Sequence, residues 1–260
     1  MFSFFLSPKR RRSRTTRKAT APEVLTLPET DLTFTLQRDT FRTLRLTVKT
    51  DGSILVKAPA SVPLEMVMTF VRSRLDWIDK KRALFLQHKS TPMEYCDGGL
   101  IYCFGQPFRI AIVPARRGAK PHLLRGYLEL PCRDERPELV EKAFKAWQQE
   151  LAKLILARRL ARLERLACRI LGDTVRPSAL TVRSLKRRWG SCSVRGEITL
   201  AAQLTAMPLP LIDYVICHEL CHLRRMDHSP YFYKALLCLL PDAKEREKQL
   251  RIWSFEHPRT

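Results

Sequence analysis

The chain has 260 residues, of which 45% are hydrophobic, so it can bury a real core in one or two domains. No apolar run approaches the twenty or so residues that a membrane-spanning helix requires, so no transmembrane segment is expected. Lysine and arginine number 47 against 26 aspartates and glutamates, which gives a formal net charge of +21. This excess favours contact with polyanions such as nucleic acid or anionic lipid, although a solvated basic surface explains the same composition.

The eight cysteines are scattered and form no C-x-x-C pair, which argues against a zinc ribbon or a thioredoxin motif. In a chain of this size they are typical of free thiols in a reducing compartment, so a cytoplasmic location is predicted. The cysteines are Cys96, Cys103, Cys132, Cys168, Cys192, Cys217, Cys221 and Cys238.

Residues 1–22 are predicted to form a basic, disordered tail. Seven lysines and arginines lie between Lys9 and Lys18, and no acidic residue occurs before Glu23. The apolar start, Met1–Leu6, is too short for the apolar region of a secretory signal, and the charges follow it. Such a tail can contact anions, although an organelle-targeting peptide has a similar composition.

The segment from Leu32 to Ala58 alternates apolar and polar residues with a period of two, which is typical of half-buried strands. Asp51-Gly52, between its last two apolar runs, is a hairpin turn signal. A single helix is predicted to open at Ser61 and to run to about Gln87. Trp77 lies in the apolar stripe of this helix and is expected in the core.

A second group of short strands is predicted between residues 99 and 131. Pro137 then starts a long helix, and Gly172 is a good signal for its end. Residues 179–185 predict a strand, Arg187–Ser193 a loop, and Glu197–Ala201 another strand. Pro208 begins a further helix, and residues 231–240 and 242–253 predict two closing helices.

The helix that follows Pro208 contains the pattern H-E-x-x-H. His218 and His222 are four residues apart, so they share one helix face, one turn above the other. Two imidazoles at that separation can bind one tetrahedral Zn²⁺. Glu219 lies about a quarter-turn round the helix, where it cannot easily bind the same ion but can reach a water bound to it. This is the general-base position of a zinc hydrolase.

His228 is the candidate for a third ligand. It follows His222 by six residues, so a straight helix would carry it away from the metal. Arg224 and Arg225 suit the last turn of a helix, and Ser229-Pro230 is typical of the start of a new one. The chain is therefore expected to reverse here. Three protein ligands would leave a fourth position open, which is typical of a catalytic zinc site.

This helix has two other interpretations. A chance H-E-x-x-H occurs in roughly one chain in a hundred of this length, and the third histidine makes chance less frequent still. A structural site that also uses Cys217 and Cys221 fails on geometry, because the cysteines lie on a face about 100° from the histidines. Both cysteines are expected to be small buried apolar groups.

Two motifs carry a resemblance to a known family. They are Arg188-Trp189-Gly190-Ser191-Cys192-Ser193 and His218-Glu219-Leu220-Cys221-His222-Leu223 followed by His228-Ser229. In them the chain resembles the YgjP-like metallopeptidases, small zincins related to the WLM and SprT-like groups. The resemblance implies that His218, His222 and His228 bind the metal and that Glu219 is catalytic. The chain departs from the family at Ala201-Ala202-Gln203, where Asn-Trp-Arg is common.

In zincins an edge strand beside the metal commonly holds an extended peptide by main-chain pairing. If the Glu197–Ala201 strand has that role, the Trp189–Ser193 loop lies near the mouth of the cleft. Cys192 as a nucleophile is a competing idea, which a metal-activated water makes unnecessary. The residues expected to contact substrate are Arg188, Trp189, Ser191 and Tyr231, and Arg188 and Tyr231 are also guesses for the partner of the oxyanion.

The sequence therefore predicts an α+β fold, with an N-terminal strand-rich region that carries one helix and a mostly helical, zincin-like C-terminal domain. The expected division is a tail over residues 1–22, an N-terminal α+β region over 23–135 and a metallopeptidase domain over 136–260. The expected function is that of a zinc-dependent metallohydrolase with one Zn²⁺ per chain, acting on peptides or proteins.

Two alternative functions also involve a bound metal. A metal-dependent hydrolase of nucleotide phosphoanhydrides would hold phosphate with Arg187, Arg188 or Arg195. A basic nucleic-acid-binding protein with a structural metal would have no need of the Glu219 carboxylate.

Overall fold

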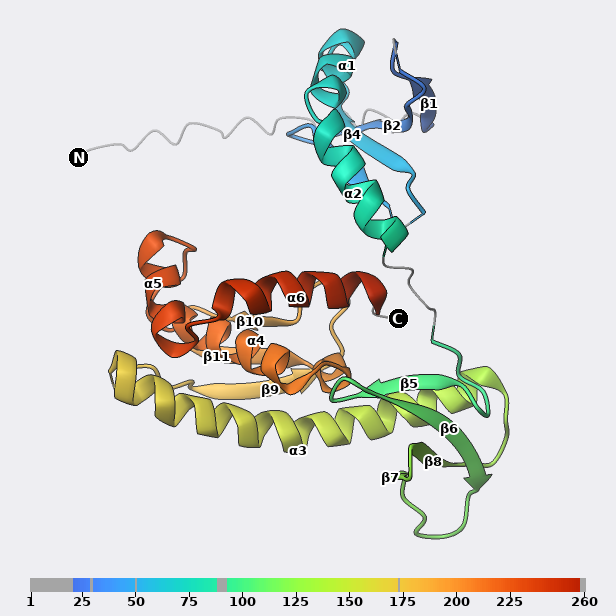
Figure 1. Ribbon diagram of the computed structural model, residues 1–260, viewed down its shortest axis with the longest axis vertical. Coiled ribbons are helices and arrows are strands. Elements are labelled where there is room, and N and C mark those ends of the chain that lie inside the picture. Colours follow the sequence, from blue (N-terminus) through green and yellow to red (C-terminus); the bar gives the residue numbers. More distant parts are fainter. Residues whose placement is uncertain (1–20, 29, 50, 88–92, 173, 258–260) are drawn as a thin grey trace, which may run out of the picture. The chain divides into compact units, whose positions relative to one another are not determined.

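The computed structural model describes residues 21–28, 30–49, 51–87, 93–172 and 174–257, and nearly all of the predicted tail lies outside them. The chain divides into two compact units, Met1–Lys89 and Ser90–Thr260 (Figure 1). Six α-helices and three sheets occur in the described part, so the α+β prediction is confirmed. Within those ranges no helix is both long and apolar enough to cross a bilayer.

The first unit is built on a four-stranded sheet in which the strands follow the order β1-β2-β4-β3. The predicted hairpin is confirmed, because Lys49 N donates to Ser53 O over 2.8 Å and Gly52 adopts a positive φ of 80°. Alternate residues such as Phe34, Leu36 and Val56 face the core. The strands are β1 (Glu23–Thr26), β2 (Thr33–Asp39), β3 (Arg45–Val48) and β4 (Ile54–Pro59).

The single helix predicted after Ser61 is wrong, since the segment forms two helices, α1 (Leu64–Arg72) and α2 (Leu75–Gln87). Ser73 ends the first one. Its hydroxyl donates to Phe70 O over 2.8 Å, an alternative to regular helical bonding that serine side chains offer. Trp77 in α2 is 41% exposed, so its expected place in the core is wrong, while the neighbouring Ile78 is fully buried.

The second unit begins with a sheet of the same topology, in the order β5-β6-β8-β7. It packs on the first turns of α3 through a shared core that includes Ile101, Leu128 and Phe144. The division near Glu135 expected from the sequence therefore falls inside this unit, because the sheet and the helix bury each other. The strands are β5 (Leu100–Cys103), β6 (Gln106–Pro114), β7 (His122–Leu124) and β8 (Tyr127–Cys132).

The long helix α3 (Pro137–Leu171) has the predicted bounds. Gly172 ends it with a φ of 99°, in the left-handed region that glycine tolerates. Its second half buries one stripe in the core of the second unit, at Ala152, Leu156, Leu160, Leu163 and Ala167. Figure 1 shows α3 along one side of this unit, with β9 and α4 on its inner side, and it contacts both.

A three-stranded sheet lies beside the helices in the order β10-β11-β9. The strands are β9 (Ala179–Arg183), β10 (Gly190–Cys192) and β11 (Glu197–Ala201). The predicted loop over residues 187–193 thus holds a short strand, which pairs antiparallel with β11. The edge strands of this sheet are β10 and β9, and not the Glu197–Ala201 strand proposed from the sequence, because β11 is hydrogen-bonded on both sides.

Helix α4 (Leu209–His222) is the centre of the second unit, and ten of its fourteen residues are buried. A short 3₁₀ helix (Ala202–Ala206) precedes it, and α5 (Pro230–Leu239) and α6 (Ala243–Glu256) follow. Arg159 of α3 fixes its position by a two-fold ion pair with Asp213, at 2.8 Å and 2.6 Å. Both side chains are mostly buried, so this pair holds α4 firmly against α3.

Candidate metal centre

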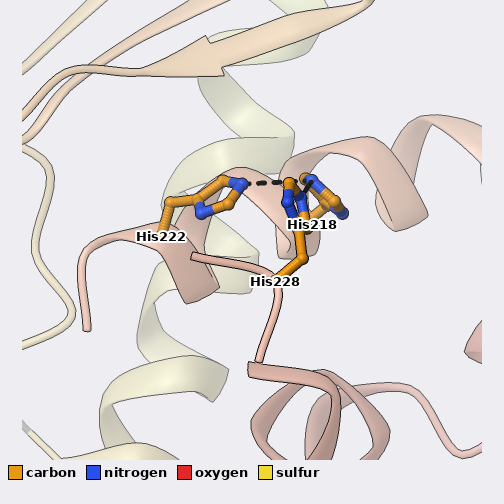
Figure 2. Close-up of side chains that lie close together, drawn as sticks. All are labelled: His218, His222 and His228. Atoms are coloured by element: carbon orange, nitrogen blue, oxygen red, sulfur yellow. Dashed lines mark hydrogen bonds between the residues drawn. The ribbon is translucent and has the colours of Figure 1, made fainter. Parts of the chain in front are cut away.

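Three histidines converge at the end of α4. His218 and His222 lie on one face of the helix, and His228 returns from the turn before α5 (Figure 2). The Nε2 atom of His218 lies 3.2 Å from that of His222 and 3.1 Å from that of His228. The chain reversal expected from the sequence therefore occurs. One ligand atom of each histidine lies within 4.8 Å of the other two.

These separations suit a small tetrahedral cation. Zinc is bound by histidine at about 2.0–2.1 Å, so two ligands of a tetrahedron stand about 3.3 Å apart. The two Nε2 separations are close to that value. Three neutral imidazoles are also a ligand set that zinc prefers, and they leave one position of the tetrahedron open. The donor set thus fits a catalytic zinc ion.

The protonation of the rings also suits metal binding. His222 Nδ1 donates to the backbone oxygen of Arg225 over 2.9 Å, so the lone pair of this ring is on Nε2. Burial and the two neighbouring histidines lower the pKa of His218 to about 4. Burial likewise lowers the pKa of His222. Both rings are therefore neutral at pH 7, the form that binds metals.

Phe232 of α5 packs against all three rings. It is fully buried, and its ring centroid lies 4.9, 4.7 and 4.9 Å from those of His218, His222 and His228. An aromatic ring in this place excludes water from one side of the cluster and restricts the rotation of the imidazoles.

Glu219 is held against the edge strand β10. Its side chain is only 5% exposed. A Cβ placed on Gly190 would lie 2.6 Å from Glu219 Oε1 and 2.9 Å from its Cγ. Only glycine leaves room here, so the Trp-Gly-Ser motif and the H-E-x-x-H helix meet at this contact.

The environment of Glu219 suits a proton acceptor. Burial raises the pKa of its carboxyl to about 7, and the positive charge of Arg188 acts in the opposite direction. A general base works best when its pKa is near the operating pH. A cation bound by the three histidines would further favour the ionised form.

Comparison with known proteins decides the family. The model of the YgjP-like metallopeptidase domain matches residues 42–252, which is most of the chain. The chain belongs to the YgjP-like metallopeptidase family. Membership implies a metallohydrolase with a bound metal, typically zinc. No curated protein matches the chain.

The similar solved structures include the metallopeptidase zymogen of Pyrococcus abyssi abylysin. The two chains are 26% identical over a region that covers 38% of this chain and 97% of that one, with a TM-score of 0.33.

In this YgjP-like domain, replacing Gly190 with alanine should lower turnover by about 100-fold while the metal stays bound. The added methyl group would displace the Glu219 carboxylate, and a shift of about 1 Å at a reacting group costs about that much. Metal content by atomic absorption and hydrolysis of a peptide measure the two effects. Val194→Ala is the control, because Val194 lies in the same hairpin and is 88% exposed. Full activity in Gly190→Ala would mean that the carboxylate position is not critical.

The thiols of the three cysteines near the site are neutral at pH 7. Burial raises the pKa of both Cys217 and Cys221 to about 12, and both lie in the core, as predicted. Cys192 lies on β10, where burial and the nearby Glu219 charge raise its pKa to about 11. Its thiol is therefore neutral at pH 7, which disfavours the nucleophile considered from the sequence.

The four residues predicted to contact substrate differ in their exposure and in the direction of their side chains. Arg188 is exposed and close enough to influence Glu219. Trp189 packs against the core, and its Nε1 donates to Ser254 Oγ over 3.1 Å. Ser191 directs its side chain to the sheet face opposite Gly190, away from Glu219. Tyr231 is 69% exposed on α5, under the guanidinium of Arg225.

Two tyrosines near the cluster were not identified from the sequence. The ring of Tyr214 lies 6.1 Å from that of His218, and the ring of Tyr233 lies 6.4 Å from that of His228. Helical spacing could have found Tyr214, which is one turn before His218 on the same face. Tyr233 could not be found in this way, because its position depends on how the chain reverses at His228.

Proposed function

We propose that the protein is a zinc-dependent peptidase that binds one Zn²⁺ per chain through His218, His222 and His228. The observation that carries the proposal is the convergence of the three Nε2 atoms, together with the buried Glu219 that follows His218 in the same helix. Zinc bound there would polarise the scissile carbonyl and lower the pKa of a water molecule to about 7.

The residues of the chain have separate roles in this proposal. Glu219 accepts a proton from the attacking water and donates it to the leaving amine, a step typically worth about 10²–10⁴ in rate. Gly190 keeps space for that carboxylate. Phe232 holds the imidazoles in place, and Arg188 is the nearby positive charge that could stabilise the oxyanion.

The edge strand β10 supports an extended peptide as the substrate. Ala201 N donates to Trp189 O and Ser193 N donates to Glu197 O, at 2.8 Å and 2.9 Å, so these two residues of the hairpin face β11. Successive residues of an antiparallel strand point their N–H and C=O groups to opposite sides of the strand. Those of Gly190 and Cys192 therefore point to the free edge of β10. A peptide paired there would pass beside Glu219.

Removal of the metal is the first test of this function. Dialysis against a zinc chelator should abolish peptide hydrolysis, and one equivalent of Zn²⁺ should restore it, because in this proposal the water that attacks the peptide is activated only by the bound ion. A peptide library with mass-spectrometric detection identifies cleavage, and atomic absorption gives the stoichiometry. Hydrolysis that persists in the fully metal-free protein would exclude the mechanism.

A second candidate function is supported by the position of Arg188. An exposed arginine beside Glu219, next to Arg187 in the sequence, could hold a phosphate group instead of an oxyanion. A metal-dependent hydrolase of nucleotide phosphoanhydrides would use it in this way. The same metal-removal experiment, run in parallel with nucleoside triphosphates, decides between the two substrates.

The cytoplasmic location stays a prediction. All eight cysteines are free thiols in the structure, which supports a reducing compartment.

A further inference from the structure

A pocket of about 700 Å³ lies against the third histidine of the metal centre. His228 itself contributes to the wall, together with Pro230, Tyr233 and Leu237. The volume is in the range of pockets that bind ligands in other proteins. The catalytic roles proposed for Glu219 and the three histidines do not involve this pocket.

The pocket lies on the side of the metal centre that is open to solvent. Of the three histidines, His222 is buried, His218 is partly buried and His228 is exposed. Phe232 closes the inner side of the cluster, since it is fully buried against all three rings. A molecule that approaches the metal from solvent on the side of His228 therefore meets the pocket.

One face of α5 forms an apolar part of the pocket wall. Tyr233, Lys234 and Leu237 are three or four residues apart or adjacent, so at 100° per residue they lie within about 100° of one another on the helix. Tyr233 is 43% exposed, and Leu237 is partly exposed, whereas Phe232 and Leu236 are buried in the core. This face therefore offers an apolar surface to the carbon chain of a ligand.

Two lysines from different helices give the pocket its charge. Lys234 belongs to α5 and Lys244 to the first turn of α6, and both are exposed. A lysine in the first turn lies near the positive end of the helix dipole, which is unfavourable until an anion binds. In the part of the chain that the structure describes, no carboxylate lines the pocket or forms an ion pair with either lysine.

The acidic residues close to Lys244 on α6 do not neutralise it, because they have partners of their own. These partners, at 2.9, 3.2 and 3.1 Å, are Arg246 for Asp242, Gln249 for Glu245 and Arg251 for Glu247. Lys234 also lines a second pocket, of about 460 Å³, to which Arg224 and Arg225 contribute. The surroundings of both lysines are therefore positive, and they attract a carboxylate.

We propose that the pocket beside His228 binds an acidic part of the peptide substrate, with its carboxylate between Lys234 and Lys244 and its carbon chain against Tyr233 and Leu237. The inference rests on the peptidase function proposed above and names its substrate class, peptides that carry a carboxylate close to the scissile bond. That carboxylate comes either from an acidic side chain or from the C-terminus of the peptide. A phosphate group would use the lysines and gain nothing from the apolar wall, so the combination favours a peptide.

Neutralising the two lysines tests the proposal. Lys234→Gln and Lys244→Gln are combined in the zinc-loaded full chain, with Glu219→Gln in both the variant and its reference so that peptides are bound and not cleaved. Fluorescence anisotropy measures the binding of a labelled, C-terminally amidated serine-rich peptide whose central residues are glutamate or glutamine. Affinity for the glutamate peptide should fall about 5-fold or more, because each exposed lysine–carboxylate pair contributes up to about 5-fold. Affinity for the glutamine peptide should stay within about 2-fold.

A matched control separates the pocket from the total charge of the chain. Lys120→Gln with Lys142→Gln removes the same charge from exposed positions elsewhere in the second unit. Its affinity for the glutamate peptide should stay within about 2-fold of the reference, because salt screens distant surface charges. Equal losses in the two variants would overturn the proposal, and so would a reference protein that binds the peptides with and without a carboxylate equally.

A third peptide separates the two sources of the carboxylate. It is serine-rich, contains no glutamate and has a free C-terminus. If it binds more tightly than its amidated form and loses this advantage in the Lys234 and Lys244 variant, the pocket recognises the C-terminus. If only the glutamate peptide depends on the lysines, the pocket recognises acidic side chains. Tighter binding of ATP than of either peptide through the same lysines would assign the pocket to phosphate and overturn the proposal.

Charge reversal tests the same pocket through cleavage. Lys234→Glu with Lys244→Glu, in the chain that retains Glu219, should prefer lysine where the unmodified chain prefers a carboxylate, while the zinc content is unchanged. The ratio of kcat/KM for paired peptides measures this preference, and an unaltered ratio would contradict the proposal. If no peptide is cleaved by any form of the protein, the peptidase function fails, and the binding measurements still decide whether the pocket holds acidic peptides.

Discussion

Turnover of a validated peptide should fall by about 10²–10⁴ when Glu219 is replaced by glutamine, while the metal stays bound near one equivalent. Glutamine keeps the size of the side chain and removes the proton acceptor. The three histidines are untouched, and Glu219 lies off the face that they share, against Gly190. The change therefore removes general-base catalysis and leaves the metal site intact.

Single-turnover hydrolysis and atomic absorption on the same sample give the two quantities for Glu219→Gln. Glu138→Gln is the matched control, because Glu138 is exposed in the first turn of α3 and should affect neither quantity. Loss of metal in Glu219→Gln would make this residue a ligand or an anchor for the ligands. Full turnover with metal bound would remove it from the mechanism and exclude the peptidase proposed above.

The same variant also separates the enzyme from a binding protein with a structural metal. A module that only binds nucleic acid has no use for a buried carboxylate beside the metal. Burial raises the pKa of Glu219 to about 7, which shows that ionising it there is unfavourable. A buried carboxyl group with a raised pKa is typical of catalytic sites.

The parts of the site that were predictable are those set by local rules. The helical period places His218 and His222 on one face whatever surrounds them. Turn and capping signals around Ser229-Pro230 indicated that the chain reverses, and α5 does begin at Pro230. Strand alternation and the glycine at the end of α3 likewise depend only on neighbouring residues.

The parts that were missed depend on contacts between distant segments. The strand β10 has three residues, and only its pairing with β11 makes it a strand. The need for glycine at position 190 is visible only once Glu219 lies against it. Trp77 was assigned to the core by helical spacing, but its neighbour Ile78 is the one buried in the core, and that depends on how α2 packs in the first unit. None of these follows from periodicity.

The second large effect is expected at His228, where replacement by alanine should weaken metal binding by at least 10-fold. Substitutions of groups that merely support ligands cost about 10- to 100-fold in affinity, so loss of a ligand should cost no less. His228 reaches the cluster from the turn before α5, and its Nε2 lies 3.1 Å from that of His218. Competition with a chromogenic zinc chelator measures the affinity, and circular dichroism confirms that the metal-free variant is folded.

The control for His228→Ala is His122→Ala, which removes a histidine from β7 that is not part of the cluster. Its zinc affinity should match that of the unmodified chain. If His228→Ala also kept full affinity, another side chain would have to be the third ligand, and Glu245, Glu247 and Glu256 of α6 would be the candidates. Peptidase activity should then survive in His228→Ala and disappear with the carboxylate. If zinc affinity falls in His228→Ala and not in His122→Ala, metal binding depends on the chain reversal that brings the His228 ring back to α4.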